Sequence, residues 1–148
     1  MKWNVVKHGK QRELKDEKKQ TAALLRLEGQ NALIECSGQT QTVQLDAQPH
    51  AITLTLSPQL EGKLIWNGKE NGIWALRPPV YEEAEVRYGS EVFRLRCRGV
   101  RCQILKQDHV IGWIQPNQIE SDEPDPLLAA FLILVHCRMI EEKDCLLV

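Results

Sequence analysis

The chain has 148 residues, of which 43% are hydrophobic and 26% are charged, and its 19 Lys and Arg nearly balance its 20 Asp and Glu. This length and composition suffice for one domain with its own core, so a wholly disordered protein is excluded and a single domain over 1–148 is expected. The formal net charge of −1 also excludes a global field that would draw the protein onto nucleic acid or an anionic membrane. Any such binding would need a local patch.

Five cysteines lie scattered along the chain, and no CxxC pair occurs among Cys36, Cys97, Cys102, Cys137 and Cys145. An odd number of dispersed cysteines is typical of a reducing, intracellular compartment. The amino terminus turns polar at Lys7, before an apolar run of signal-peptide length has formed. The sequence therefore predicts a cytoplasmic protein.

The first twenty residues begin with a short β-like segment at 3–7 and continue into a charged stretch, 7–20, with almost no apolar side chains. A mixed-charge stretch of this kind is typical of a solvated surface segment. We expect a charged loop or a frayed helix over 7–20, with a docking segment for an anionic partner as the alternative.

From Thr21 onward, short apolar segments recur about every eight to twelve residues between Gly, Pro and Asn turn signals, a spacing typical of β-sandwiches and barrels. Within 52–56 apolar and polar residues alternate strictly, which buries one face of a strand and leaves the other wet. No segment between 21 and 115 keeps a helical period long enough for a helix. Strand–helix–strand nucleotide-binding folds are therefore disfavoured.

The segment 83–115 predicts a four-stranded meander with two-residue turns at 89–90, 98–99 and 107–108. In the first hairpin apolar residues face apolar ones and acids face arginines, with the pairs Val86–Phe93, Ala84–Leu95, Glu85–Arg94 and Glu83–Arg96. Continued through the later turns, the register pairs Leu95 with Cys102, Phe93 with Ile104, Ile104 with Ile111 and Cys102 with Trp113. One continuous apolar face results, which favours this register.

The carboxyl-terminal part changes character, because an acidic, Pro-rich link at 121–126 leads into the apolar run 127–135. The acidic approach suits the positive end of a helix dipole, and we expect a core helix over 125–142, with a buried strand as the competing interpretation. Nine apolar residues fall well short of the ~20 that span a bilayer, so no transmembrane span is expected. A helix that is apolar nearly all round must be enclosed by protein.

These elements predict a mainly β fold, an antiparallel meander barrel of about 10–12 short strands enclosing a hydrophobic C-terminal helix. The strand pair 100–105 and 110–114, the acidic link and the run 125–133 resemble the closing elements of the tubby C-terminal-like superfamily, which includes tubby domains, phospholipid scramblases and LURP-one-related proteins. The resemblance covers the whole chain in topology and about the last fifty residues in motif. It implies a twelve-stranded barrel around a central helix. The chain has no counterpart of the scramblase calcium segment or of the basic phosphoinositide loops of tubby domains, so those activities are not carried over.

Four arginines, Arg94, Arg96, Arg98 and Arg101, can project from one face of the meander. Guanidinium groups bind phosphate or carboxylate bidentately, so such a stripe suits a phosphoinositide headgroup or an acidic protein segment. The register places Glu85 and Glu83 opposite the first two arginines, which leaves Arg98 and Arg101 as the candidate anion- or lipid-binding residues. A solvated face paired across its strands is the plainer interpretation.

The four tryptophans, Trp3, Trp66, Trp74 and Trp113, could form a stacking platform, although core or rim packing explains them as well. The meander places Trp113 on the buried face. Trp66 and Trp74 flank turns, and together with His136 they are candidates for the rim of a pocket at one barrel end. No basic groove accompanies them, so a nucleic-acid partner is not expected.

Cys97 and Cys102 fall on the apolar face with no His or third Cys nearby in sequence, so we interpret them as small buried hydrophobes and expect no metal and no cofactor. His136 is expected to bond to the barrel backbone or to emerge at the barrel end. No local motif for a hydrolase, kinase or dehydrogenase occurs. A Cys/His pair that joins Cys137 or Cys145 to His136 or His109 stays open, but no catalytic residue is predicted.

The sequence thus favours a non-enzymatic binding module of tubby/scramblase-like type, which binds a phospholipid headgroup or a protein partner at its surface. Peripheral membrane contact is compatible with this function. The alternative is a small-ligand carrier or an enzyme with a cleft at one end of the barrel.

Overall fold

The computed structural model describes residues 1–28, 31–48, 51–56, 59–65, 82–98 and 100–146, without the side chains of 141–146. These residues form a meander of antiparallel strands that closes on itself, because β12 pairs with β1. The strands are β1 (Lys2–His8), β2 (Gln11–Lys15), β3 (Thr21–Glu28), β4 (Asn31–Cys36), β5 (Gln39–Gln48), β6 (Ala51–Leu56), β7 (Leu60–Ile65), β8 (Glu83–Tyr88), β9 (Glu91–Arg98), β10 (Arg101–Lys106), β11 (His109–Gln115) and β12 (Gln118–Ser121), and one helix follows, α1 (Pro126–Leu146). The predicted mainly β barrel with a C-terminal helix is confirmed.

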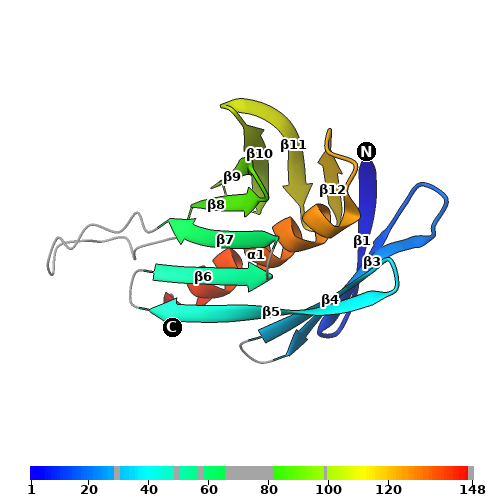
Figure 1. Cartoon of the computed structure of the whole chain (residues 1–148), viewed down its shortest axis with the longest axis horizontal. Coiled ribbons are helices and arrows are strands. Elements are labelled where there is room, and N and C mark those ends of the chain that lie inside the picture. Colours follow the sequence, from blue (N-terminus) through cyan, green and yellow to red (C-terminus); the bar gives the residue numbers. More distant parts are fainter. Residues whose placement is uncertain (29–30, 49–50, 57–58, 66–81, 99, 147–148) are drawn as a thin grey trace, which may run out of the picture.

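The helix α1 runs through the barrel (Figure 1). Ala130, Phe131 and Val135 have no exposed surface, and α1 contacts β3, β4, β7, β8 and β12. A helix without a polar face is stable only when apolar side chains surround it, and the inward positions of the barrel strands supply them. The predicted helix is thereby confirmed over the competing strand. No helix in the described part of the chain is long and apolar enough to cross a membrane.

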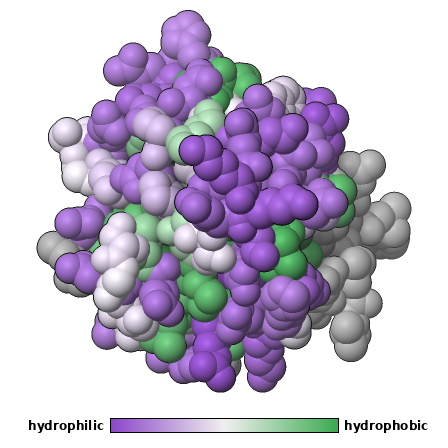
Figure 2. Space-filling view, turned by 90° about the vertical axis from the view of Figure 1, so that its right-hand side faces the viewer, coloured by the Kyte–Doolittle hydropathy of each residue, from purple (hydrophilic) through white to green (hydrophobic). Residues whose placement is uncertain are grey.

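The outer wall of the barrel is largely polar on the side that Figure 2 shows, with apolar residues scattered among hydrophilic ones. The alternation within the strands explains this. In β9, for example, Phe93, Leu95 and Cys97 are buried, whereas the intervening Arg94 and Arg96 are exposed. Polar outward and apolar inward positions therefore follow directly from the two-residue period of a strand.

The charged stretch 7–20 is not a loop or a frayed helix, because its centre forms strand β2 and its first residues complete β1. Leu14 is fully buried and points inward, while the charged neighbours of Leu14 lie on the outer face. One strongly apolar residue, Leu14, is therefore enough to place β2 in the barrel wall. The turn that follows is held by Asp16, whose Oδ1 accepts hydrogen bonds from the backbone N–H groups of Lys18 and Gln20, both at 2.9 Å.

The predicted register of the β8–β9 hairpin is confirmed in all four pairs, from Glu83–Arg96 to Val86–Phe93. The β9–β10 register differs from the prediction by two residues, because Arg98 pairs with Arg101. Cys97 therefore faces Cys102 directly. A shift of two residues preserves which side chains point inward.

The predicted β10–β11 register is wrong by one residue beyond the turn. The two-residue turn at 107–108 is confirmed, but a β-bulge between Ile104 and Leu105 shifts the pairing. Ile104 then faces Gly112, not Ile111, and Gln103 faces Trp113. Because an odd shift exchanges the two faces of a strand, the bulge moves Trp113 from the predicted core to the outer wall.

Candidate functional site

The outer faces of β9, β10 and β11 form a shallow hollow of about 360 Å³ that is lined by Arg96, Arg98, Arg101, Gln103 and Trp113. The strand register brings these residues together, because Arg96 faces Gln103, Arg98 faces Arg101, and Gln103 faces Trp113. Arg98 and Arg101, the anion-binding candidates from the sequence, therefore share one site. Sequence reasoning missed Trp113 and Gln103 here, because the predicted meander had no bulge, although Gly112 beside the extra residue Ile111 is a sequence signal for one.

The three arginines of this hollow differ in their partners. Arg96 donates a hydrogen bond from Nε to Glu83 at 3.3 Å, as the register predicted. The guanidinium carbon of Arg101 lies 4.9 Å from the centre of the Trp113 ring, a cation–π contact. Among the described residues, neither Arg98 nor Arg101 has a carboxylate partner. Two like charges thus face each other across a strand pair, an arrangement that destabilises a sheet unless an anion lies between them.

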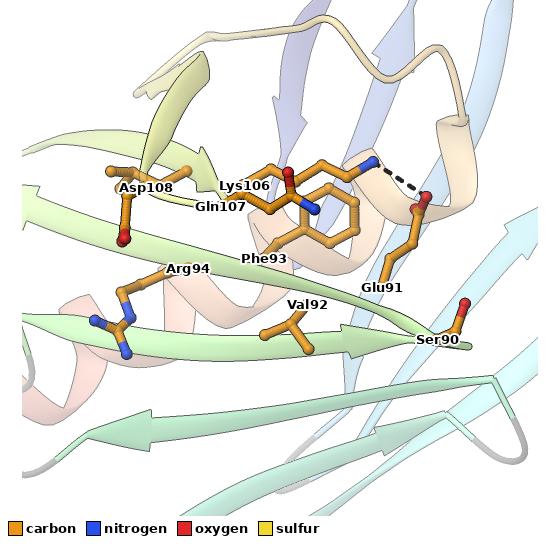
Figure 3. A pocket seen from close by; sticks show the side chains of 9 residues that line it. Ser90, Glu91, Val92, Phe93, Arg94, Lys106, Gln107 and Asp108 are labelled. Carbon is orange, nitrogen blue, oxygen red and sulfur yellow. Dashed lines mark hydrogen bonds and ion pairs between the residues drawn. The ribbon is translucent and has the colours of Figure 1, made fainter.

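A second hollow, of about 500 Å³, lies at the other end of the same strands (Figure 3). Its main cation, Lys106, donates hydrogen bonds to Glu123 at 2.8 Å and Glu91 at 3.1 Å, and these bonds raise the pKa of Lys106. Figure 3 shows the Lys106 side chain directed toward Glu91, away from Arg94. Because the lysine is already neutralised and Asp108 also lines the hollow, this site suits an anion less well.

Arg94 has no ion pair among the described residues, although the register does place it opposite Glu85. The Glu85 carboxylate instead accepts a hydrogen bond from Arg87 at 3.1 Å. The sequence prediction was therefore right for the neutralisation of Arg96 and wrong for that of Arg94. Arg94 lies in the second hollow and is separated from Arg98 along β9.

Inside the barrel, three potential ligand residues converge from β9, β10 and α1. Cys97 and Cys102 form a disulfide across the strand pair, with 4.0 Å between their Cα atoms, which contradicts the expectation of two plain thiols. The ligand atoms of these two cysteines and of His136 all lie within 4.8 Å of one another. The sequence could not show this cluster, because His136 is distant along the chain from both cysteines.

His136, one of the predicted pocket-rim residues, is 5% exposed and lies in the core. Burial lowers the pKa of His136 to about 4, which keeps the imidazole neutral. The Nε2 atom of His136 has no hydrogen-bond partner in the described part of the chain, and the expected bond from this atom to the barrel backbone is absent there. Trp66 and Trp74, the other rim candidates, lie outside the described residues.

The residues of the open Cys/His pair lie in different surroundings. Cys137 is half-buried on α1 and packs against the core, whereas His109 is exposed at the start of β11. The side chain of Cys145 lies outside the described part of the structure. Nothing in these positions adds support for a nucleophilic pair.

Comparison with known proteins adds no relative to this picture: no family model, no curated protein and no solved structure matches the chain. The resemblance to the tubby C-terminal-like superfamily therefore stays a prediction. The described residues hold two clusters of chemically distinctive side chains, the outer arginine hollow and the inner Cys97–Cys102–His136 group.

Proposed function

We propose that the protein is a non-enzymatic binding module that takes a phosphorylated lipid headgroup in the hollow between Arg98, Arg101 and Trp113. The observation that carries this proposal is the pair Arg98–Arg101, two guanidinium groups in register on neighbouring strands without a carboxylate partner among the described residues. A bound phosphate would replace the repulsion of this pair with two charge-assisted hydrogen-bonding interactions.

The rest of the hollow suits the same ligand. Arg96 and Gln103 add donors on one side, and the half-buried Trp113 adds an aromatic wall. A volume of about 360 Å³ is at the lower end of the range of small-ligand sites, roughly 300–1,000 Å³, and fits a polar headgroup better than an acyl chain. Arginine is the residue best suited to phosphate, because its planar fork presents two parallel donors.

A membrane is favoured over an acidic peptide by an exposed apolar residue beside the arginines. Val100 is 57% exposed between β9 and β10, two residues after Arg98 and directly before Arg101 in the chain. An apolar side chain flanked by arginines is suited to an anionic bilayer surface, where the charges meet headgroups and the apolar group enters the interface. The proposal includes a cytoplasmic location, and Cys36, which is not part of a disulfide, is consistent with it.

Cosedimentation with phosphatidylcholine vesicles, with and without a phosphoinositide, tests the proposal. The double variant Arg98→Glu with Arg101→Glu should weaken phosphoinositide-dependent binding by at least about tenfold, since each lost charge-assisted bond is worth on the order of 1.4 kcal/mol or more. A matched control, Lys10→Glu with Lys18→Glu, changes the net charge equally at exposed positions near β2. This control should bind like the wild type, and wild-type binding should fall as salt is added.

Equal losses of phosphoinositide-dependent binding in both double variants would show that net charge alone causes the loss, and would overturn the proposed site. Equal binding to vesicles without phosphoinositide would also overturn it. Arg98- and Arg101-dependent binding to an acidic peptide, with no binding to either vesicle, would replace the lipid by a protein partner.

The alternative function, a carrier or an enzyme with a cleft at the barrel end, is not favoured by any observation on the described residues. It relied on a rim of Trp66, Trp74 and His136, of which His136 lies in the core and the two tryptophans lie outside the described residues. The helix α1 also occupies the barrel interior, where a carrier would hold its ligand (Figure 1).

A further inference from the structure

The inner cluster places two cysteines, a histidine and a methionine around one point of the core. Cys97 and Cys102 face each other across β9 and β10, and His136 approaches both from α1. Met139 lies on the same side of α1, with its Sδ 4.0 Å from the Cys97 Sγ. The four side chains are between 0% and 9% exposed, so the cluster is shielded from water.

We propose that the reduced form of this cluster is a metal site, in which the Cys97 and Cys102 thiolates and the neutral imidazole of His136 bind one thiophilic d10 ion, Zn(II) or Cu(I). Thiolate and imidazole are the ligands that such ions prefer, and three of them converge here from three separate elements. This inference is independent of the lipid site, because all of its ligands point into the barrel.

The His136 side chain gives the second observation. Only 5% of the His136 surface is exposed, and its Nε2 atom is buried without a hydrogen-bond partner in the described part of the chain. Buried polar atoms in folded proteins nearly always have a partner, so an orphaned one requires a physical explanation. A metal ion bound by Nε2 and the two sulfurs would supply this partner.

Charge balance favours Zn(II) at this site, whereas the soft thioether of Met139 favours Cu(I). Two thiolates and Zn(II) form a neutral group with the imidazole, which limits the desolvation cost in a core. The Met139 thioether, close to Cys97, is a poor zinc ligand and a good one for Cu(I). Zn(II) is therefore expected to bind through three protein ligands, and Cu(I) to depend on Met139 as well.

Formation of the site from the disulfide is a two-electron reduction. A phosphine reductant supplies the electrons and becomes the phosphine oxide with an oxygen from water, and the Cys97–Cys102 bond opens to two thiols. Metal binding then releases the two thiol protons and forms two metal–sulfur bonds, with no further change of oxidation state. The metal-bound form and the disulfide exclude each other, since the same two sulfur atoms make either set of bonds.

The test uses the full chain, reduced with a phosphine and freed of metal by dialysis. Zn(II) and Cu(I) are titrated separately against a chromophoric chelator, and Co(II) serves as a spectroscopic probe of thiolate coordination. One ion per chain is expected, with a sulfur-to-cobalt charge-transfer band. The variant His136→Leu should weaken binding by at least about 100-fold, since loss of a second-shell partner alone weakens metal sites about 10- to 100-fold.

Matched variants keep the test independent of folding. Cys36→Ala removes a thiol outside the cluster and should bind like the wild type. His136→Leu removes an orphaned polar atom and should fold at least as well as the wild type, so a loss of binding in it cannot be a loss of fold. Met139→Leu should weaken Cu(I) and leave Zn(II) unchanged. Binding that is absent for both ions, or equal in Cys36→Ala and His136→Leu, would overturn the site.

Discussion

The hydroxyl of Tyr88 donates a hydrogen bond to Oδ2 of Asp125 at 2.7 Å and thereby ties the end of β8 to the start of α1. The other oxygen of the same carboxylate, Oδ1, accepts a hydrogen bond from the Leu127 N–H at 2.9 Å. One aspartate therefore caps the helix and anchors it to the barrel wall. Because the helix fills the core, this contact fixes where the core element enters the barrel.

Substitution of Tyr88 by Phe should lower the free energy of unfolding by about 1 kcal/mol, because one partly solvated hydrogen bond is lost and the ring is kept. Asp125→Ala should lower it by more, about 1–2 kcal/mol, since the helix also loses its cap. Urea denaturation measures both effects. Asp122→Ala, at an exposed position of the same link, is the control. Additive losses in the Tyr88→Phe, Asp125→Ala double variant would mean that the two residues do not interact.

The same contact predicts a loss of stability at high pH. The hydrogen bond to Asp125, together with burial, raises the pKa of Tyr88 from 10.0 to about 12. Between these two values the unfolded chain has released the phenol proton and the folded chain has kept it, so the free energy of unfolding falls as the pH rises from 10 to 12. Below pH 10 the stabilisation is fully present. The fall should be smaller in Tyr88→Phe when both proteins are unfolded with urea across this range, and identical slopes would contradict it.

The fold was predictable from the sequence where two independent patterns agreed. In the β8–β9 hairpin, Val86–Phe93 satisfied the apolar pattern and Glu83–Arg96 satisfied the charge pattern, and only one register meets both. In the β9–β10 pair, the predicted register and the observed register differ by two residues and therefore bury the same side chains. Alternation alone could not choose between them, so the direct Cys97–Cys102 pairing was missed.

Three further differences between the predicted and the observed structure had other physical causes. The bulge opposite Ile104 and Leu105 leaves Ile111 as the extra residue of β11 and exchanges the faces of that strand. Gly112, inside the strand and next to the extra residue, was a sequence signal for it that the prediction did not use. The sequence predicted a loop for β2 because Leu14 is its only strongly apolar residue. One inward-facing apolar side chain is enough for a short strand of this barrel. The approach of His136 to the cysteines is a tertiary contact between a helix and two strands, which local patterns do not contain.

Phe131 tests whether α1 is the structural core. This ring is fully buried, and its replacement by Ala should lower the free energy of unfolding by about 3–5 kcal/mol through lost burial and a residual cavity. Thermal or urea unfolding measures this loss. The control Ile140→Ala, at a half-buried position of the same helix, should lose clearly less. Leu132→Asp, which would place a carboxylate in the core, should abolish expression of folded protein. Normal folding of Leu132→Asp would refute the enclosed helix.

Gly62 on β7 allows the helix to approach the barrel wall closely. A Cβ atom at this position would lie 2.9 Å from Cγ2 of Val135 and 3.1 Å from Cε1 of Phe131. Gly62→Ala should therefore destabilise the protein by about 1–3 kcal/mol, as is typical of overpacked cores. Val135→Ala removes the nearest atom, so the double variant should be more stable than the sum of the two single losses predicts. Strict additivity in a urea denaturation cycle would show that no steric contact links the two positions.

The arginines on β9 should respond to charge reversal with opposite signs, although they are only two residues apart. Arg96→Glu removes the 3.3 Å ion pair with Glu83 and puts two carboxylates in register, which should lower the free energy of unfolding by up to about 1 kcal/mol. Arg98→Glu instead creates an opposite-charge pair with Arg101 and should leave stability unchanged or raise it by a few tenths of a kcal/mol.

Both effects arise at exposed charges, so the difference between the variants should shrink as salt is raised from about 0.01 M to 1 M. Urea denaturation at the two salt concentrations measures it. Glutamate at position 98 would stabilise the strand pair better than arginine, because it would face Arg101 with the opposite charge. An anion bound in the hollow would explain why two arginines face each other there. Destabilisation by Arg98→Glu as large as that by Arg96→Glu would show that Arg98 already has a stabilising partner, and would remove the main support for the headgroup site.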